Sequence, residues 1–408
     1  MTKTPGQGAP LRALLLEGIH PDAVEVLSAA GVQVDTLPGA LDEDALAQAV
    51  LGVHVLGVRS GTHVTAKVLA AADELLVVGA FCIGTNQIDL AETSRRGVAV
   101  FNAPFSNTRS VVELALAEVI ALTRRMTQKS AALHAGVWDK SAAGAHEVRG
   151  RTLGIVGYGN IGSQLSVLAE AIGMSVLYYD TEHRLGLGNA RRAETLDEVL
   201  DSADVVTLHV DGRPGNGGMF GEAQFARMRP GALFLNLSRG FVVDHEALAR
   251  HIASGHIAGA AVDVFPAEPA RRGDPFVSVL QGLPNVILTP HIGGSTEEAQ
   301  QDIGSFVAAK LRDFVSDGTT SLSVNLPRLA MEPPPHTHRL AHLHRNVPGV
   351  LATINRVLAD HSVNVEGQIL TTSGEYGYAI TDIAVDYSED VLVTLAAMPE
   401  TVRLRLLS

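Results

Sequence analysis

The sequence of 408 residues contains a single cysteine, Cys82. One thiol cannot form an intrachain disulfide or a thiolate metal cluster, which fits a reducing compartment, so we expect a cytoplasmic protein. Long apolar runs are also missing, because no stretch approaches the ~18 uninterrupted residues of a membrane span. The apolar run that ends at Leu16 is followed at once by Glu17 and is too short for the core of a signal peptide.

Positive charge is scarce. Lys and Arg total 31 against 44 Asp and Glu, which gives a net charge of −13. This balance excludes broad nucleic-acid binding, which needs a basic face, but it allows a small cationic pocket for an anionic metabolite. The hydrophobic fraction of 46% and charged fraction of 18% predict packed cores rather than disorder. At roughly 150 residues per domain, the length predicts two or three domains.

Short apolar strands alternate with helical patterns from residue 12 to about residue 290. This alternation predicts parallel sheets covered by helices on both faces. We expect one α/β unit before residue 106, a helix over 110–124 buried on most sides, and a second α/β unit from Thr152. Three consecutive prolines within 330–338 predict a linker. The last 70 or so residues show a βαββαβ order, which predicts a small ferredoxin-like domain.

A glycine-rich motif, G-Y-G-N-I-G, predicts a dinucleotide site. Gly157, Gly159 and Gly162 follow the apolar strand TLGIV and open a helical pattern. In this context the glycines allow a tight turn, close approach of a pyrophosphate and close helix–strand packing. Asp180 ends the next strand, where a carboxylate binds the adenosine ribose hydroxyls and favours NAD, although Arg184 leaves NADP open.

Three polar residues follow consecutive predicted strands of the second unit. Arg239 follows LFLNLS, Glu268 follows GAAVDV, and His291 follows NVILTP. Each alone fits an ordinary exposed loop or turn residue. Together they supply a base, a group that tunes it and a cation for a carboxylate, as hydride transfer from a hydroxyacid requires. We expect the substrate site in a cleft between the two α/β units.

Several segments resemble the D-isomer-specific 2-hydroxyacid dehydrogenase family, namely MRPGALFLNLSRGFVVD, DVFPAEP and LTPHIGG. Others, including RSGTHVT, VVGAFCIGTNQIDL, FNAPFSNTRSVVE and WDKSAAGAHEVRG, resemble the branch that acts in the first step of L-serine biosynthesis. The resemblance covers essentially the whole chain. It implies a flavodoxin-like substrate domain over 1–105 and 295–329, a Rossmann NAD domain over 106–294, a linker over 330–337 and an ACT regulatory domain over 338–408.

The resemblance also implies an activity, the NAD-dependent oxidation of 3-phospho-D-glycerate to 3-phosphohydroxypyruvate. His291 would be the acid/base, Glu268 its partner, and Arg239 the residue that holds the substrate carboxylate. Reduction of 2-oxoglutarate is an expected side activity, since both substrates pair a carboxylate with a distal anion. The implied cofactor contacts are Gly157, Tyr158, Gly159, Asn160, Ile161, Gly162, Asp180, Leu237, Ser238, Arg239, Asp263, His291, Ile292, Gly293 and Gly294. The implied substrate contacts are Arg59, Ser60, Asn107, Lys140 and Arg239.

For the C-terminal domain the resemblance implies feedback inhibition by L-serine at His344, Asn346 and Asn364. A dimerisation domain without a ligand is the alternative. The histidines between 336 and 344 suggest a metal, but no nearby carboxylate completes a site, so we expect none. The family also implies a homo-oligomer, with a tetramer favoured, in which Trp138 reaches a neighbouring subunit.

Three positions depart from the family pattern. Pro38 and Gly61 stand where relatives carry Lys and Arg, and Asp211 stands where Pro is usual. Fewer cations would weaken recognition of a phosphate dianion, so a dehydrogenase for another D-2-hydroxyacid is one alternative. A non-enzymatic NAD-sensing protein on the same scaffold is another, although the intact Arg239, Glu268 and His291 speak against it.

Overall fold

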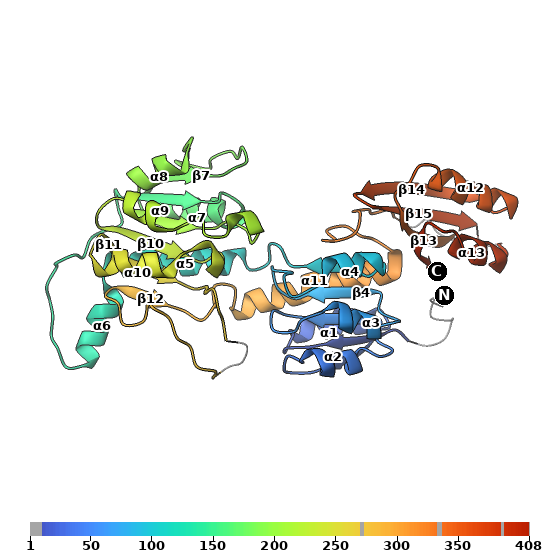
Figure 1. Cartoon of the computed structure of the whole chain (residues 1–408), viewed down its shortest axis with the longest axis horizontal. Helices are drawn as coiled ribbons and strands as arrows, with labels where there is room; N and C mark the ends of the chain where they lie inside the picture. Colours follow the sequence, from blue (N-terminus) through green and yellow to red (C-terminus); the bar gives the residue numbers. More distant parts are fainter. Residues whose placement is uncertain (1–9, 270–272, 333–336, 385–386, 408) are drawn as a thin grey trace. The chain divides into compact units, whose positions relative to one another are not determined.

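The computed structural model describes residues 10–269, 273–332, 337–384 and 387–407. The chain divides into two compact units, one drawn from Met1–Ser106 and Gln300–Ser408, the other from Asn107–Ala299 (Figure 1). Among the described helices, none is both long and apolar enough to cross a membrane.

The first unit contains a five-stranded parallel sheet in the order β2-β1-β3-β4-β5, as in flavodoxin-like folds. Its strands are β1 (Arg12–Leu15), β2 (Gln33–Thr36), β3 (Val55–Val58), β4 (Val77–Ala80) and β5 (Ala99–Asn102). Its helices are α1 (Pro21–Ala29), α2 (Glu43–Ala49), α3 (Ala66–Ala71), α4 (Leu90–Arg95) and, from Gln300 on, α11 (Glu297–Asp317). The central strands β3 and β4 are wholly buried, because helices cover both faces of the sheet.

The second unit contains a seven-stranded parallel sheet in the order β12-β11-β10-β9-β6-β7-β8. Its strands are β6 (Thr152–Val156), β7 (Ser175–Tyr179), β8 (Arg191–Arg192), β9 (Val205–Leu208), β10 (Ala232–Asn236), β11 (Ile257–Val262) and β12 (Val286–Leu288). Its α-helices are α5 (Thr108–Thr123), α6 (Met126–His134), α7 (Asn160–Ala171), α8 (Leu196–Ser202), α9 (Glu222–Arg227) and α10 (His245–Ala253). Strand order reverses between β6 and β9, which is where open α/β sheets bind ligands.

Helix α5 is buried on most sides, as the sequence predicts. Val112, Ala115 and Val119 are fully buried in the core of the second unit. Along this helix only Arg109, Glu113 and Ala117 are exposed, and they form one narrow stripe. The helix packs against α7 as well as against the sheet, which explains its burial.

The C-terminal residues form an antiparallel sheet in the order β14-β15-β13-β16, with its two helices between the strands in chain order. The strands are β13 (Thr337–Arg345), β14 (Val365–Ser373), β15 (Tyr376–Ala384) and β16 (Thr401–Leu407), and the helices are α12 (Val350–Asp360) and α13 (Glu389–Ala396). The predicted α/β fold class with a ferredoxin-like module is confirmed. The proline run of the predicted linker, at 333–335, lies outside the described residues.

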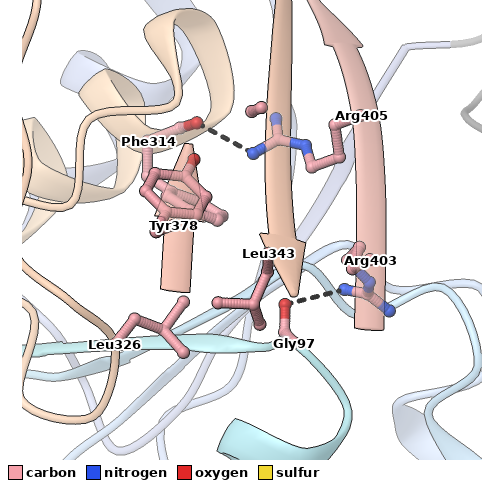
Figure 2. A pocket seen from close by; sticks show the side chains of 8 residues that line it. Gly97, Phe314, Leu326, Leu343, Tyr378, Arg403 and Arg405 are labelled. Carbon is pink, nitrogen blue, oxygen red and sulfur yellow. Dashed lines mark hydrogen bonds between the residues drawn. The ribbon is translucent and has the colours of Figure 1, made fainter. Parts of the chain in front are cut away.

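This C-terminal module packs into the first unit. Leu343 and Tyr378 belong to the same buried cluster as Leu311 of α11. On β16, Arg405 donates from Nη1 to the main-chain oxygen of Phe314 at 3.0 Å, and Figure 2 shows this bond beside the small cavity that these residues line. A guanidinium that meets the carbonyls at the end of α11 stabilises a helix C-terminus, so the module is anchored by charge as well as by apolar packing.

Candidate active site

The three fingerprint glycines have different surroundings. A Cβ on Gly157, where φ is +93°, would lie 2.6 Å from the oxygen of His209, and one on Gly162 would lie 2.3 Å from the oxygen of Gly157. A Cβ on Gly159 would meet nothing within 4 Å. Two of the glycines are therefore required by packing, and the third leaves open space before α7. No side chain caps the start of α7 at Asn160, so its first N–H groups are available to a pyrophosphate.

The carboxylate of Asp180 lies beside this loop, at the end of β7. It accepts hydrogen bonds from the N–H of Tyr158 at 2.7 Å and of Glu182 at 2.8 Å. Arg184 donates to Glu182 at 2.5 Å, so the cation that could attract a 2′-phosphate is already paired. The charges at this end of the site suit the ribose hydroxyls of NAD.

Tyr158, in the fingerprint loop, has a buried side chain. It is 3% exposed, and its ring stacks on Tyr178 with the centroids 3.7 Å apart. Its hydroxyl lies 2.7 Å from the hydroxyl of Ser166. Any contact of Tyr158 with a cofactor is therefore left to its backbone, while the side chain holds the loop to the core.

The structure brings Glu268 and His291 together. Nδ1 of His291 lies 2.8 Å from Oε2 of Glu268, and Oε1 of Glu268 accepts from the N–H of Phe265 at 3.0 Å. The hydrogen bond to Glu268 raises the pKa of His291, against an opposing effect of burial. Burial acts to raise the pKa of Glu268, but the hydrogen bonds from His291 and Phe265 outweigh it and lower that pKa overall. Nε2 of the imidazole is left to exchange a proton with a ligand.

Asp263, at the end of β11, organises the loop that carries His291. Its Oδ1 accepts from the hydroxyl of Thr289 at 2.6 Å and from the N–H of Ile292 at 2.8 Å, and its Oδ2 accepts from the N–H of Gly293 at 2.8 Å. Asp263 is 1% exposed. Its carboxylate therefore lies buried against the turn that carries His291. The cofactor contact that the family resemblance implies for Asp263 stays a prediction.

Arg239 comes after the end of β10, which is the strand that pairs with β11. Its Nη1 donates to the oxygen of Ser238 at 2.7 Å, and Ser238 in turn is held by two hydrogen bonds to Asn236. A Cβ on Gly240 would lie 1.9 Å from the main chain of Phe265, so a glycine there lets the Arg239 loop approach the loop of Glu268 closely. The second unit thus holds a cation, a base and the partner of that base on consecutive strand ends.

The predicted substrate residues are divided between the two units. Arg59 and Ser60 lie in the first unit, and Asn107 and Lys140 in the second. The carboxylate of Glu17, which the sequence did not single out, accepts from the N–H groups of Arg59 at 2.9 Å, Gly61 at 2.9 Å and Thr62 at 3.0 Å. No local pattern reveals this role, because Glu17 is more than forty positions from the loop that it shapes.

In the C-terminal module, His344 is 2% exposed and its Nδ1 lies 2.8 Å from the oxygen of Arg345. Its Nε2 is buried and finds no hydrogen-bond partner among the described residues. Asn346 and Asn364 are exposed, and their amides donate to Gly374 and Glu366 respectively. A Cβ on Gly377 of β15 would lie 2.8 Å from this Nε2, so the ring of His344 packs closely against the neighbouring strand.

Comparisons with known proteins identify the family of this chain. Residues 116–293 match the model of the D-isomer specific 2-hydroxyacid dehydrogenase NAD-binding domain, and residues 340–403 match that of an AHAS small subunit-like ACT domain. The chain is 47% identical to D-3-phosphoglycerate dehydrogenase of Escherichia coli over the full length of both, and 46% identical to that of Dictyostelium discoideum over 97% of both. The crystal structure of D-lactate dehydrogenase from Aquifex aeolicus, with NAD and lactic acid, covers 74% of this chain and 95% of its own, with a TM-score of 0.65 and 25% identity. The chain belongs to the D-3-phosphoglycerate dehydrogenase family of NAD-dependent oxidoreductases, with an ACT domain at its C-terminal end.

Proposed function

We propose that this chain oxidises 3-phospho-D-glycerate to 3-phosphohydroxypyruvate, as the first step of L-serine synthesis. The observation that carries the proposal is the His291–Glu268 hydrogen bond of 2.8 Å, on strand ends next to that of Arg239. An acid/base with a raised pKa and a cation for a carboxylate are what the reaction needs from the protein. The phosphorylated substrate is proposed because the full-length relatives are D-3-phosphoglycerate dehydrogenases.

In the oxidation direction, Nε2 of His291 takes the proton of the substrate hydroxyl. Glu268 accepts from Nδ1–H, so it orients the ring and stabilises the imidazolium that forms. NAD, when bound, would supply the acceptor for the hydride that leaves the carbon bearing this hydroxyl. In the reverse direction the same imidazolium returns the proton to the carbonyl oxygen.

Arg239 holds the substrate carboxylate through its guanidinium fork and draws electron density from the adjacent carbonyl. Arg59 and Ser60 would hold the phosphate, together with Asn107 and Lys140. The loop of Arg59 has its N–H groups fixed by Glu17, which orients it but consumes donors that could otherwise serve a phosphate. Reduction of 2-oxoglutarate, whose distal carboxylate carries one negative charge, is proposed as a side activity.

The C-terminal module is proposed to bind L-serine at His344, Asn346 and Asn364, and to lower turnover when it does. The unpartnered Nε2 of His344 and the exposed amides support this assignment. A homotetramer is proposed for the assembly. Trp138, which is 76% exposed, supports a contact with a second copy, because a largely exposed tryptophan suits a subunit interface.

The test is NADH oxidation with 3-phosphohydroxypyruvate, 2-oxoglutarate and unphosphorylated 2-oxoacids such as pyruvate, each with and without L-serine. We expect the highest kcat/KM for the phosphorylated acid and its suppression by L-serine. A preference for unphosphorylated acids would refute the proposed substrate. In that case the change in substrate preference would be assigned to Gly61 and Pro38, which replace cations of the family pattern.

A further inference from the structure

The loop after β9 places a charged pair beside Arg239. A Cβ built on Gly212 would lie 3.3 Å from Nε of Arg239, so the backbone of this loop lies directly against the guanidinium stem. Gly212 is flanked by Asp211 and Arg213, which carry opposite charges. The Asp211 carboxylate is therefore a neighbour of the cation that is proposed to bind the carboxylate of the substrate.

Asp211 is held by hydrogen bonds from Arg213 and Asn216. Arg213 meets it as a fork, with Nε 2.8 Å from Oδ1 and Nη2 2.6 Å from Oδ2. The amide of Asn216 donates to Oδ1 and to the main-chain oxygen of Asp211, both at 3.0 Å. These hydrogen bonds from Arg213 lower the pKa of Asp211, and the charge of Arg239 lowers it further, which reflects how near the second cation lies.

The guanidinium of Arg239 makes fewer hydrogen bonds than that of Arg213. Its side chain makes one hydrogen bond within the described chain, from Nη1 to the oxygen of Ser238. The remaining donors are available to a ligand. A neighbouring carboxylate without its own cation would occupy these donors, because a guanidinium fork pairs with any carboxylate in reach.

We propose that Arg213 is a positioning residue that holds Asp211 away from Arg239 and so keeps Arg239 open to the substrate carboxylate. This inference rests on the proposed role of Arg239. Without Arg213, Asp211 acts as an internal competitor that the substrate must displace. An internal competitor raises KM for the substrate and leaves kcat at saturation unchanged.

The test uses the full chain with Arg213→Gln, assayed by NADH oxidation with 3-phosphohydroxypyruvate and with 2-oxoglutarate. We expect KM for both acids to rise roughly twofold to fivefold, within the range that a solvent-exposed ion pair can supply, with kcat close to that of wild type. The rise should shrink as ionic strength increases, because salt screens an exposed pair. Adding Asp211→Asn to the Arg213→Gln chain should return KM to the wild-type value, because the internal competitor is then gone.

Arg227→Gln is the matched control, since Arg227 forms an exposed fork with Asp201 in the same unit, and it should leave KM for both acids unchanged. An Arg213→Gln variant with normal KM would overturn the proposal. So would a raised KM that persists in the double variant, or an effect confined to the Kd of NADH. The variant Arg239→Gln distinguishes a failure of the role proposed for Arg239 from a failure of the role proposed for Arg213. If that variant keeps a normal KM, the proposed role of Arg239 itself fails, whereas a silent Arg213→Gln beside an inactive Arg239→Gln defeats only the role of Arg213.

Discussion

The N–H of His291 donates to the main-chain oxygen of Asp263 at 2.8 Å, while His291 itself has a left-handed backbone with φ of +55°. A residue with a Cβ pays a conformational cost of roughly 1–2 kcal/mol in this region, so the surrounding contacts must hold it there. The side chain of Asp263 supplies those contacts through its hydrogen bonds to Thr289, Ile292 and Gly293. The orientation of the proposed acid/base therefore depends on one buried carboxylate.

The first prediction concerns the variant Asp263→Asn. The carboxylate accepts three hydrogen bonds, whereas an amide accepts with one oxygen and turns an NH₂ toward a backbone donor. We expect turnover to fall at least about tenfold and the unfolding free energy to fall by about 1–3 kcal/mol, because a buried donor is left unpaired. Steady-state kinetics and thermal melting measure the two effects. Thr289→Ser keeps its donor hydroxyl and should resemble wild type, and normal turnover in Asp263→Asn would contradict the argument.

The second prediction concerns pH and the variant Glu268→Gln. Glu268 raises the pKa of His291, and reduction of the oxoacid needs the protonated imidazole. Turnover in that direction should fall as the pH rises through this pKa. Gln removes the charge but keeps the shape, so the fall should begin at a lower pH in the variant. The pH dependence of kcat, measured from about pH 5.5 to 9 for both proteins, tests this, and coincident profiles would rule out the proposed role of Glu268.

The third prediction separates binding from folding within the glycine fingerprint. Gly159→Ala places its methyl group in open space, so the melting temperature should stay near that of wild type. The affinity for NADH should fall at least about tenfold, because the methyl group occupies space that a pyrophosphate approaches. Gly162→Ala instead meets the oxygen of Gly157 and should lower the melting temperature. Melting curves and NADH fluorescence titrations distinguish these outcomes, and normal NADH affinity in Gly159→Ala would show that the cofactor does not approach this glycine.

The fold was predictable because strands and helices alternate with clear periods along the chain. The same pattern placed Arg239, Glu268 and His291 at strand ends. It did not reveal β8, whose two residues Arg191–Arg192 are too short for any periodicity, or α6 (Met126–His134), which has no buried residue. Helices and strands that bury little apolar surface leave little pattern in a sequence.

The contacts that orient the loops of the site could not be predicted, for another reason. Glu17 reaches a loop more than forty residues away, and the clamp of Asp263 depends on the backbone of His291. Neither follows from residue type or local spacing.

The C-terminal module also looks separable in the sequence, yet Leu343 and Tyr378 lie in a cluster shared with the first sheet and α11. Deletion from Thr337 would uncover that apolar cluster, so the response to L-serine should be tested in the full chain.

The last prediction concerns Glu118 on α5, which is 3% exposed. Both of its carboxyl oxygens are buried without a hydrogen-bond partner among the described residues. Burial, reinforced by the charge of Asp263, raises the pKa of Glu118 to about 8. The folded chain therefore keeps a proton between about pH 4.5 and 8 that the unfolded chain has released.

Folding stability should accordingly decline as the pH rises through this window, by up to roughly 1.4 kcal/mol per pH unit from this group. Glu118→Gln cannot ionise and should escape the decline, so its melting temperature should exceed that of wild type by a margin that grows from pH 5 to pH 8. Glu113→Gln is the control on the same helix, because Glu113 is exposed and paired with Arg109. Its difference from wild type should stay nearly constant with pH. A constant difference for Glu118→Gln as well would mean that Glu118 is already ionised in the folded protein.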